Sequence, residues 1–146
     1  MSERTPVGIE NQEEDIVDQA ERVIKSLTFI KNKPALKTNQ IRKFLSAVMS
    51  IRNHVIAVRG ADKAKKAASE VNNKEEDLNE DIVLEIKMLK PTIYYQAGRN
   101  KFVNEFVEKS EIISKINAVG KDYKKFDLLC KYVEALVAFH KYKGGE

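Results

Sequence analysis

The fold of this 146-residue chain is decided by one segment, Asp122-Tyr-Lys-Lys-Phe-Asp-Leu-Leu-Cys-Lys-Tyr-Val-Glu-Ala-Leu-Val-Ala-Phe-His-Lys-Tyr-Lys143, which Gly144-Gly145 follows. Apolar side chains recur in it every three or four residues, the spacing that places them on one face of an α-helix. Asp122 is a suitable N-cap, and Gly144 can adopt the left-handed conformation that ends a helix. A helix with so broad an apolar face must lie against several other helices or against another chain. The face consists of Tyr123, Phe126, Leu129, Tyr132, Val133, Leu136, Val137 and His140.

The composition favours long helices in a single domain. Apolar residues make up 42% of the chain and charged residues 33%, whereas proline (3) and glycine (6) are scarce, as is typical of amphipathic helices. A chain of this length can bury a core without disulfides or metals. The one cysteine, Cys130, lies beside Leu129 in the last helix and is interpreted as a small buried apolar residue rather than a nucleophile.

Four other helices are expected from the same spacing of apolar residues, at about residues 13–31, 38–59, 80–98 and 102–119. Thr38 is the expected N-cap of the second helix. Pro91 lies inside the third helix and is expected to kink or break it near Lys90. No strand pattern or internal repeat competes with this interpretation. The sequence therefore predicts an all-α, single-domain bundle of about five helices.

Two segments differ in amino-acid composition from the predicted helices. Residues 1–11 contain Pro6 and Gly8 and few large side chains, so they are expected to be a flexible N-terminal tail, with 12–146 forming the single helical domain. Within that domain, residues 60–79 almost lack large apolar side chains. They are therefore either a polar extension of the second helix or a linker.

The charge is unevenly distributed along the chain. Residues 1–21 contain seven acidic residues and one basic residue, a net charge of −6, so that residues 22–146 carry +10 of the overall +4. A basic body is compatible with a polyanionic partner, although solvated lysine-rich helices give the same balance.

The sequence lacks the usual signatures of catalysis, metal binding and membrane insertion. His54 and His140 belong to no metal-ligand spacing, and His140 is expected to have a surface or helix-dipole role. No Gly-rich phosphate loop and no Gly-x-Ser-x-Gly motif is present. Small helical ribonucleases with an Arg-x(4–6)-His motif are a rival class, but no arginine here precedes a histidine at that spacing. We therefore expect no enzyme, no cofactor and no metal. Without a signal peptide or an apolar run of about 18 residues, we also expect a cytoplasmic protein with no membrane partner.

Two arginines lie at the edge of the apolar face of the second helix. At about 100° per residue, Arg52 and Arg59 are within about 20° of each other around the helix axis. Their methylene groups can pack on the core while the guanidinium groups bind a phosphate. The alternative is pairing with a carboxylate of a neighbouring helix.

The tyrosines are interpreted as core residues, although aromatic rings can also stack on bases. They occur among leucine and valine at helical spacing. The four residues are Tyr94, Tyr95, Tyr123 and Tyr132.

Three segments carry a more specific signal when they are taken in order. They are Thr38-Asn39-Gln40-Ile41-Arg42-Lys43-Phe44-Leu45, then Tyr95-Gln96-Ala97-Gly98-Arg99, then Tyr132-Val133-Glu134-Ala135-Leu136-Val137-Ala138-Phe139-His140-Lys141 before Gly144-Gly145. Together they resemble the small helical subunit of the type III-A CRISPR ribonucleoprotein, the Csm-type effector. The match covers about residues 36–145. Pro91 departs from the uninterrupted helix expected there and leaves the orientation of Arg99 open.

The resemblance implies a non-catalytic subunit of an antiviral RNA-guided complex. Several copies would stack head to tail, beside the backbone and large subunits, and touch the duplex of guide RNA and target RNA mainly through phosphates. Such contacts release counterions without reading bases, which suits a system in which base pairing supplies specificity. On this basis the candidate RNA contacts are Arg42, Arg52, Arg59 and Arg99, with Lys37, Lys101 and Lys141 as secondary candidates. The alternative is a self-associating helical adaptor that binds only protein.

Overall fold

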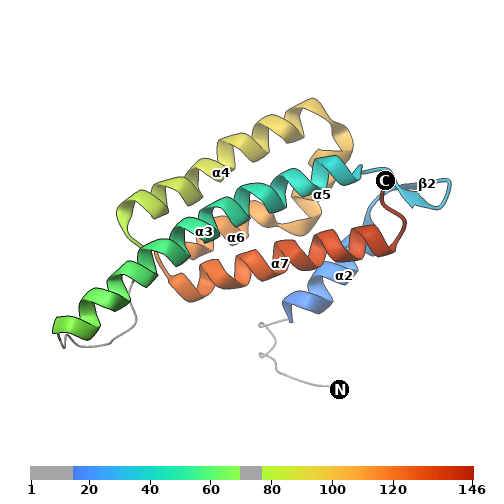
Figure 1. The fold of residues 1–146 in the computed structure, drawn as a ribbon. Helices are drawn as coiled ribbons and strands as arrows, with labels where there is room; N and C mark the ends of the chain where they lie inside the picture. The colour runs from blue at the N-terminus through green and yellow to red at the C-terminus, as the bar shows by residue number, and fades with distance from the viewer. Residues whose placement is uncertain (1–14, 70–76) are drawn as a thin grey trace, which may run out of the picture.

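The computed structural model describes residues 15–69 and 77–146, except the side chains of residues 62–69, as a helical bundle with one small hairpin (Figure 1). The predicted all-α class is confirmed, with six helices in the described ranges instead of about five. None of these helices is long and apolar enough to cross a membrane. The elements are α2 (Ile16–Ser26), β2 (Phe29–Ile30), β3 (Lys33–Pro34), α3 (Thr38–Ser69), α4 (Glu80–Arg99), α5 (Lys101–Ser110), α6 (Ile112–Val119) and α7 (Tyr123–Tyr142).

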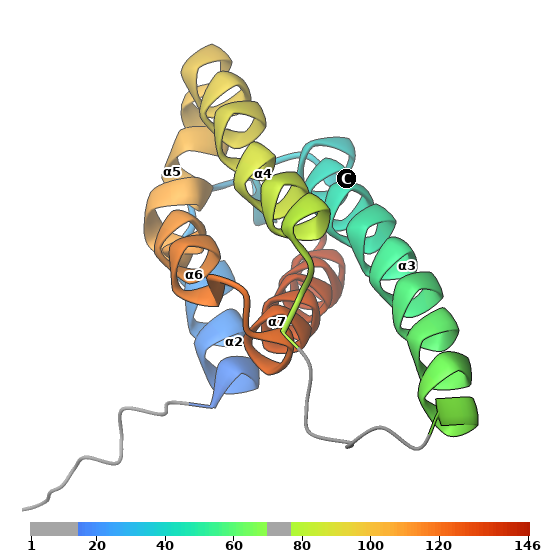
Figure 2. The same ribbon diagram turned by 90° about the vertical axis from the view of Figure 1, so that its left-hand side faces the viewer.

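Helix α7 contributes much of the core, as its broad apolar face predicts. It packs against α2, α3 and α6, and Figure 2 shows it between α2 and α3. The Asp122 carboxylate accepts hydrogen bonds from the N–H groups of Lys124 and Lys125 at 2.8 and 3.2 Å, and Gly144 has a φ of +100°. Both predicted helix ends are thus confirmed. The buried side chains of α7 are Phe126, Leu129, Cys130, Tyr132, Val133, Leu136 and His140.

The predicted first helix is too long, because α2 ends at Ser26 and a hairpin follows. Phe29 pairs with Pro34 and Ile30 with Lys33. The two turn residues, Lys31 and Asn32, have φ values of 54° and 68°. Positive φ at both positions is the geometry of a two-residue hairpin turn, which matches the twist of the flanking strands. Lysine is unusual at the first position of such a turn, so the sequence does not predict the turn.

The predicted fourth helix is in fact two helices, α5 and α6. Glu111 has a φ of 56° and separates them. The break frees the Ser110 carbonyl from the helical ladder, and the hydroxyl of buried Tyr132 donates a hydrogen bond to it at 2.9 Å. The contact with α7 thus supplies a donor for a carbonyl that would be hydrogen-bonded within the helix if the helix were continuous.

Two helices continue at positions where the sequence allowed an interruption. Helix α3 continues past Gly60 to Ser69, because alanine and lysine residues after the glycine favour helix and one glycine costs only about 1 kcal/mol. Helix α4 is continuous through Pro91, so the predicted break is wrong. Pro91 is exposed, as is Lys87, whose carbonyl loses its helical donor and can be reached by water. The tail predicted for residues 1–11, and residues 70–76 of the predicted linker or extension, lie outside the described residues.

Candidate nucleic-acid interface

A basic groove of about 690 Å³ is lined by residues of the hairpin, the start of α3, the junction of α4 and α5 and the C-terminal segment. These segments meet at one end of the bundle (Figure 1). We call it the end groove. Among the described residues that line it there are three lysines and a single carboxylate, that of Glu146. The lining residues are Ile30, Lys31, Lys33, Pro34, Ala35, Lys37, Gln40, Asn100, Phe102 and Glu146.

The N-terminus of α3 opens onto this groove, and its cap differs from the prediction. Lys37, rather than Thr38, precedes the first helical turn, and its N–H donates to Oε1 of Gln40 at 2.8 Å. Thr38 is already helical, and its N–H donates to the backbone oxygen of Glu146 at 3.0 Å. The predicted N-cap is therefore wrong: Lys37 occupies the cap position, and the Glu146 oxygen accepts the Thr38 N–H, one of the first-turn donors that have no partner within the helix.

The C-terminal residues are held in place by backbone contacts with the end of α7. The Gly145 N–H donates to the His140 carbonyl at 2.9 Å, and the Lys141 ammonium donates to the Gly145 carbonyl at 3.2 Å. A Cβ added to Gly145 would lie 2.1 Å from Cε1 of His140, so no side chain fits at this position. The close approach fixes where Glu146 emerges into the groove.

His140 is buried, and the predicted surface role is wrong. Its side chain is 0% exposed, and Nε2 lies 2.7 Å from the Leu36 carbonyl. A carbonyl can only accept, so Nε2 carries the proton. Burial lowers the pKa of His140, although the hydrogen bond to Leu36 opposes this effect. The neutral imidazole ties the end of α7 to the segment that leads into α3.

The negatively charged carboxylate of Glu146 lies near several lysines at the end groove. It forms a hydrogen-bonded ion pair with Lys33. The hydrogen bond and charge of Lys33 lower the pKa of Glu146, and the charges of Lys37 and Lys141 act in the same direction. Three lysines from different elements thus lie close enough to stabilise one anion.

Three of the seven predicted RNA contacts gather at this end of the bundle. Lys37 lines the groove, and Lys141 acts on the Glu146 carboxylate. Lys101 lies between two lining residues, with its ammonium 5.2 Å from the centre of the Phe102 ring. The sequence interpretation missed Lys31 and Lys33. The available signal was the lysine-rich stretch before Pro34.

Arg42 and Arg99 are both exposed, as a phosphate contact requires. The guanidinium of Arg99 lies 5.4 Å from the centre of the Tyr95 ring. Tyr94 and Tyr95 were predicted to lie in the core, but their exposed fractions are 56% and 63%. The prediction is wrong because both residues lie on the outer side of α4, where its apolar spacing is ambiguous.

Arg52 and Arg59 are half-buried, as expected at the edge of an apolar face, but neither lines the end groove. The guanidinium of Arg59 lies 3.7 Å from the centre of the Tyr123 ring at the start of α7. Burial raises the pKa of the Cys130 thiol to about 12, and the positive charge of nearby Arg52 acts in the opposite direction. The predicted burial of Cys130 is confirmed.

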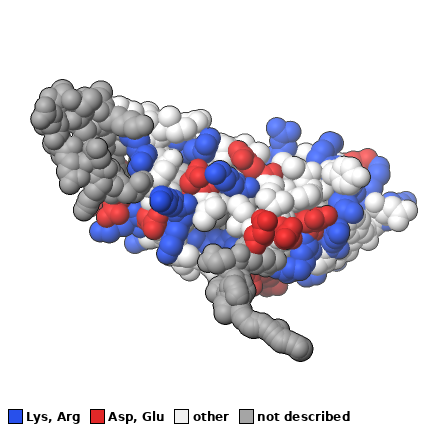
Figure 3. Space-filling view, turned by 90° about the horizontal axis from the view of Figure 1, so that it is seen from below, with Lys and Arg blue, Asp and Glu red and all other residues white. Residues whose placement is uncertain are grey.

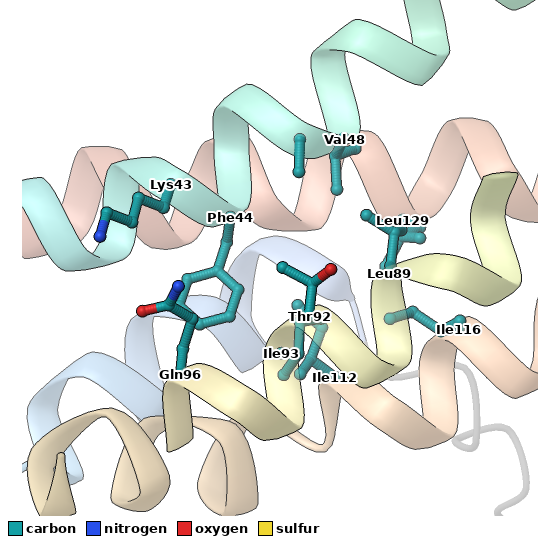
Figure 4. Close-up of a pocket in the computed structure, with 11 residues that line it drawn as sticks. Lys43, Phe44, Val48, Leu89, Thr92, Ile93, Gln96, Ile112, Ile116 and Leu129 are labelled. Carbon is teal, nitrogen blue, oxygen red and sulfur yellow. The ribbon is translucent and has the colours of Figure 1, made fainter. Parts of the chain in front are cut away.

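A smaller groove of about 150 Å³ elsewhere on the described surface contains two lysines, Lys115 and Lys125, in an otherwise mainly apolar lining. The face drawn in Figure 3 carries basic and acidic side chains side by side. A cavity of about 130 Å³ between α3 and α4 has a mainly apolar lining, with Lys43, Thr92 and Gln96 as polar members (Figure 4). Across residues 15–69 and 77–146, no cluster of three or more histidine, cysteine, aspartate or glutamate side chains could hold a metal ion.

The described elements define a small protein of the all-α class. More specifically, the chain belongs to the Csm2 type III-A family, whose model matches residues 10–146. It is 32% identical over 135 residues to the CRISPR system Cms protein Csm2 of Streptococcus thermophilus, covering 92% of this chain and 95% of that protein. It is 28% identical over 130 residues to the protein of the same name from Mycobacterium tuberculosis (strain ATCC 25618 / H37Rv), covering 89% and 92%. The resemblance to the small subunit of the type III-A Csm effector is thereby confirmed.

Proposed function

We propose that this chain is a non-catalytic small subunit that stacks in several copies within a type III-A Csm complex in the cytoplasm. In this proposal it holds target RNA along the guide through phosphate contacts, and the end groove is one of the contact sites. The gathering of lysines from separate elements around one carboxylate carries the proposal. Family membership supplies the complex in which the contact would be made.

The end groove suits a phosphate backbone better than a base. Its cations are lysines, which bind phosphate as mobile point charges and present no fixed fork for a base edge. Contacts of this kind position RNA without reading its sequence. Specificity would then come from pairing between guide and target.

The other predicted contacts fall into two groups. Arg42 and Arg99 are exposed and belong to the proposed contact set on the same terms as the groove lysines. Arg52 and Arg59 stay in the set as well, but both are half-buried on the stretch of α3 that packs beside α7. Testing the two groups separately therefore distinguishes phosphate binding from support of the bundle.

The test compares three paired variants of equal charge in the guide-loaded complex. Lys37→Gln with Lys101→Gln removes two cations at the end groove. Arg52→Gln with Arg59→Gln removes two on α3. Binding of a labelled target RNA of about 40 nucleotides is measured over a salt series, and each lost contact should flatten the slope of log affinity against log salt by about 0.7.

The control pair is Lys124→Gln with Lys125→Gln, at the start of α7 and away from the end groove. We expect the Lys37 and Lys101 pair to weaken binding and flatten the slope by about 1.4, with no change for the control. If no pair changes the slope, and the arginine pair instead releases the subunit from the complex, the protein-only adaptor replaces this proposal.

A further inference from the structure

The end groove already holds an anion, which belongs to the chain itself. The Glu146 carboxylate is paired with Lys33 and lies within the field of Lys37 and Lys141. The same residue supplies the backbone oxygen that accepts the Thr38 N–H at the start of α3. A helix N-terminus with nearby lysines is a favourable environment for a phosphate. Glu146 thus makes the interactions that a phosphate would make there.

Backbone contacts of the neighbouring residues hold this carboxylate in a defined position. Gly145 lies against the His140 ring with no room for a Cβ, and its N–H is bonded to the His140 carbonyl. The backbone oxygen of Glu146 is bonded in turn. The side chain of Glu146, in contrast, is largely exposed. The backbone therefore keeps the carboxylate at high effective concentration beside Lys33.

We propose that the Glu146 carboxylate is an internal competitor for an RNA phosphate, and that bound RNA displaces it from Lys33. This inference rests on the proposed function and adds to it an internal anion that weakens RNA binding at the end groove. In RNA-free protein the ion pair with Glu146 neutralises the charge of Lys33. On binding, a phosphodiester takes over Lys33 while Gly145 holds the backbone in place.

The cost of displacement is that of one exposed ion pair, because both side chains are more than half exposed (51% and 61%). Exposed pairs of this kind correspond to a change in affinity of up to about five-fold. Removing the carboxylate should therefore tighten RNA binding by about two- to five-fold, and less at high salt, where exposed charges are screened.

The experiment measures binding of the same labelled target RNA to guide-loaded complexes containing full-length variants. Glu146→Gln removes the charge and keeps the shape. Glu146→Asp keeps the charge and shortens the reach by one methylene. Glu80→Gln makes the same change of charge at the first turn of α4, whose 20 residues place it about 30 Å from the groove. Lys33→Gln, alone and with Glu146→Gln, completes a double-mutant cycle.

We expect Glu146→Gln to tighten binding by about two- to five-fold, Glu146→Asp to do so by less, and Glu80→Gln to have no effect. The gain from Glu146→Gln should disappear in the Lys33→Gln background, because the competitor has then lost its partner.

Two results would overturn the inference. If Glu146→Gln and Glu80→Gln tighten binding equally while Glu146→Asp does nothing, only the overall charge matters. If Glu146→Gln has no effect while the Lys37 and Lys101 pair weakens binding, the groove binds RNA but Glu146 does not compete, and the proposed function stands. If the lysine pair is also without effect, both the groove contact and the inference fail.

Discussion

Replacing His140 tests how the end groove is built, because this side chain joins two segments that are 104 residues apart. In His140→Phe the buried Leu36 carbonyl loses its imidazole donor, and an unsatisfied buried acceptor costs about 1–3 kcal/mol. In His140→Gln the amide can still donate to that carbonyl, so stability at pH 8 should stay within about 1 kcal/mol of the wild type. The phenylalanine variant should be the less stable of the two.

The pH dependence separates the hydrogen bond from the charge. Burial lowers the pKa of His140 below its ordinary value of 6.5, so below about pH 6.5 the unfolded chain binds a proton that the folded chain does not. The free energy of unfolding should therefore fall as the pH drops from 6.5 towards the folded-state pKa, by at most about 1.4 kcal/mol per pH unit. His140→Gln removes this contribution, so its stability should change less over the same range.

The assay is urea unfolding of the full chain, followed by far-UV circular dichroism at pH values from about 5.5 to 8. His54→Gln is the matched control, since His54 is exposed and pairs with Glu85 on the surface. It should retain the contribution of His140. Parallel curves for the wild type and His140→Gln would mean that the imidazole titrates alike in the folded and unfolded chains, which would refute the argument from burial.

Three other outcomes follow from buried or capping groups. Tyr132→Phe should cost about 1–2 kcal/mol in urea unfolding, because the Ser110 carbonyl loses its donor; unchanged stability would contradict this. Asn100→Ala should cost about 1 kcal/mol in the same assay, since Asn100 accepts two N–H groups at the start of α5, and an equally stable variant would show that water replaces the cap. Cys130 should react with a thiol reagent at pH 8 only after unfolding, because it is buried and its pKa is raised to about 12; rapid labelling of the folded chain would count against that environment.

The elements that the sequence predicted well depend on neighbouring residues. The Asp122 cap bonds N–H groups two and three residues away, and the left-handed Gly144 follows the last turn of the same helix. Helical spacing is similarly local, which is why α7 and most of its buried face could be predicted. The edge positions of Arg52 and Arg59 follow from the same periodicity.

Two of the errors occurred where distant contacts override local preference. The continuous helix expected over residues 102–119 is broken at Glu111, where a carbonyl gains a donor from Tyr132 of α7. His140 looked like a surface residue beside lysine and tyrosine, yet the Leu36 carbonyl holds it inside the bundle. In both cases the partner lies too far along the chain for periodicity to reveal it.

By itself the sequence determined the helical class, the ends of α7 and the basic character of the body, because apolar spacing, caps and charge are properties of short segments. It also indicated the family, through three ordered segments, and the match of the family model to residues 10–146 confirms that family. Only the tertiary structure decided that Lys33, Lys37 and Lys141 meet at one carboxylate. Lys33 and Glu146 are 113 residues apart, and such a pair exists only after the packing of α7 has brought the C-terminal residues beside the hairpin.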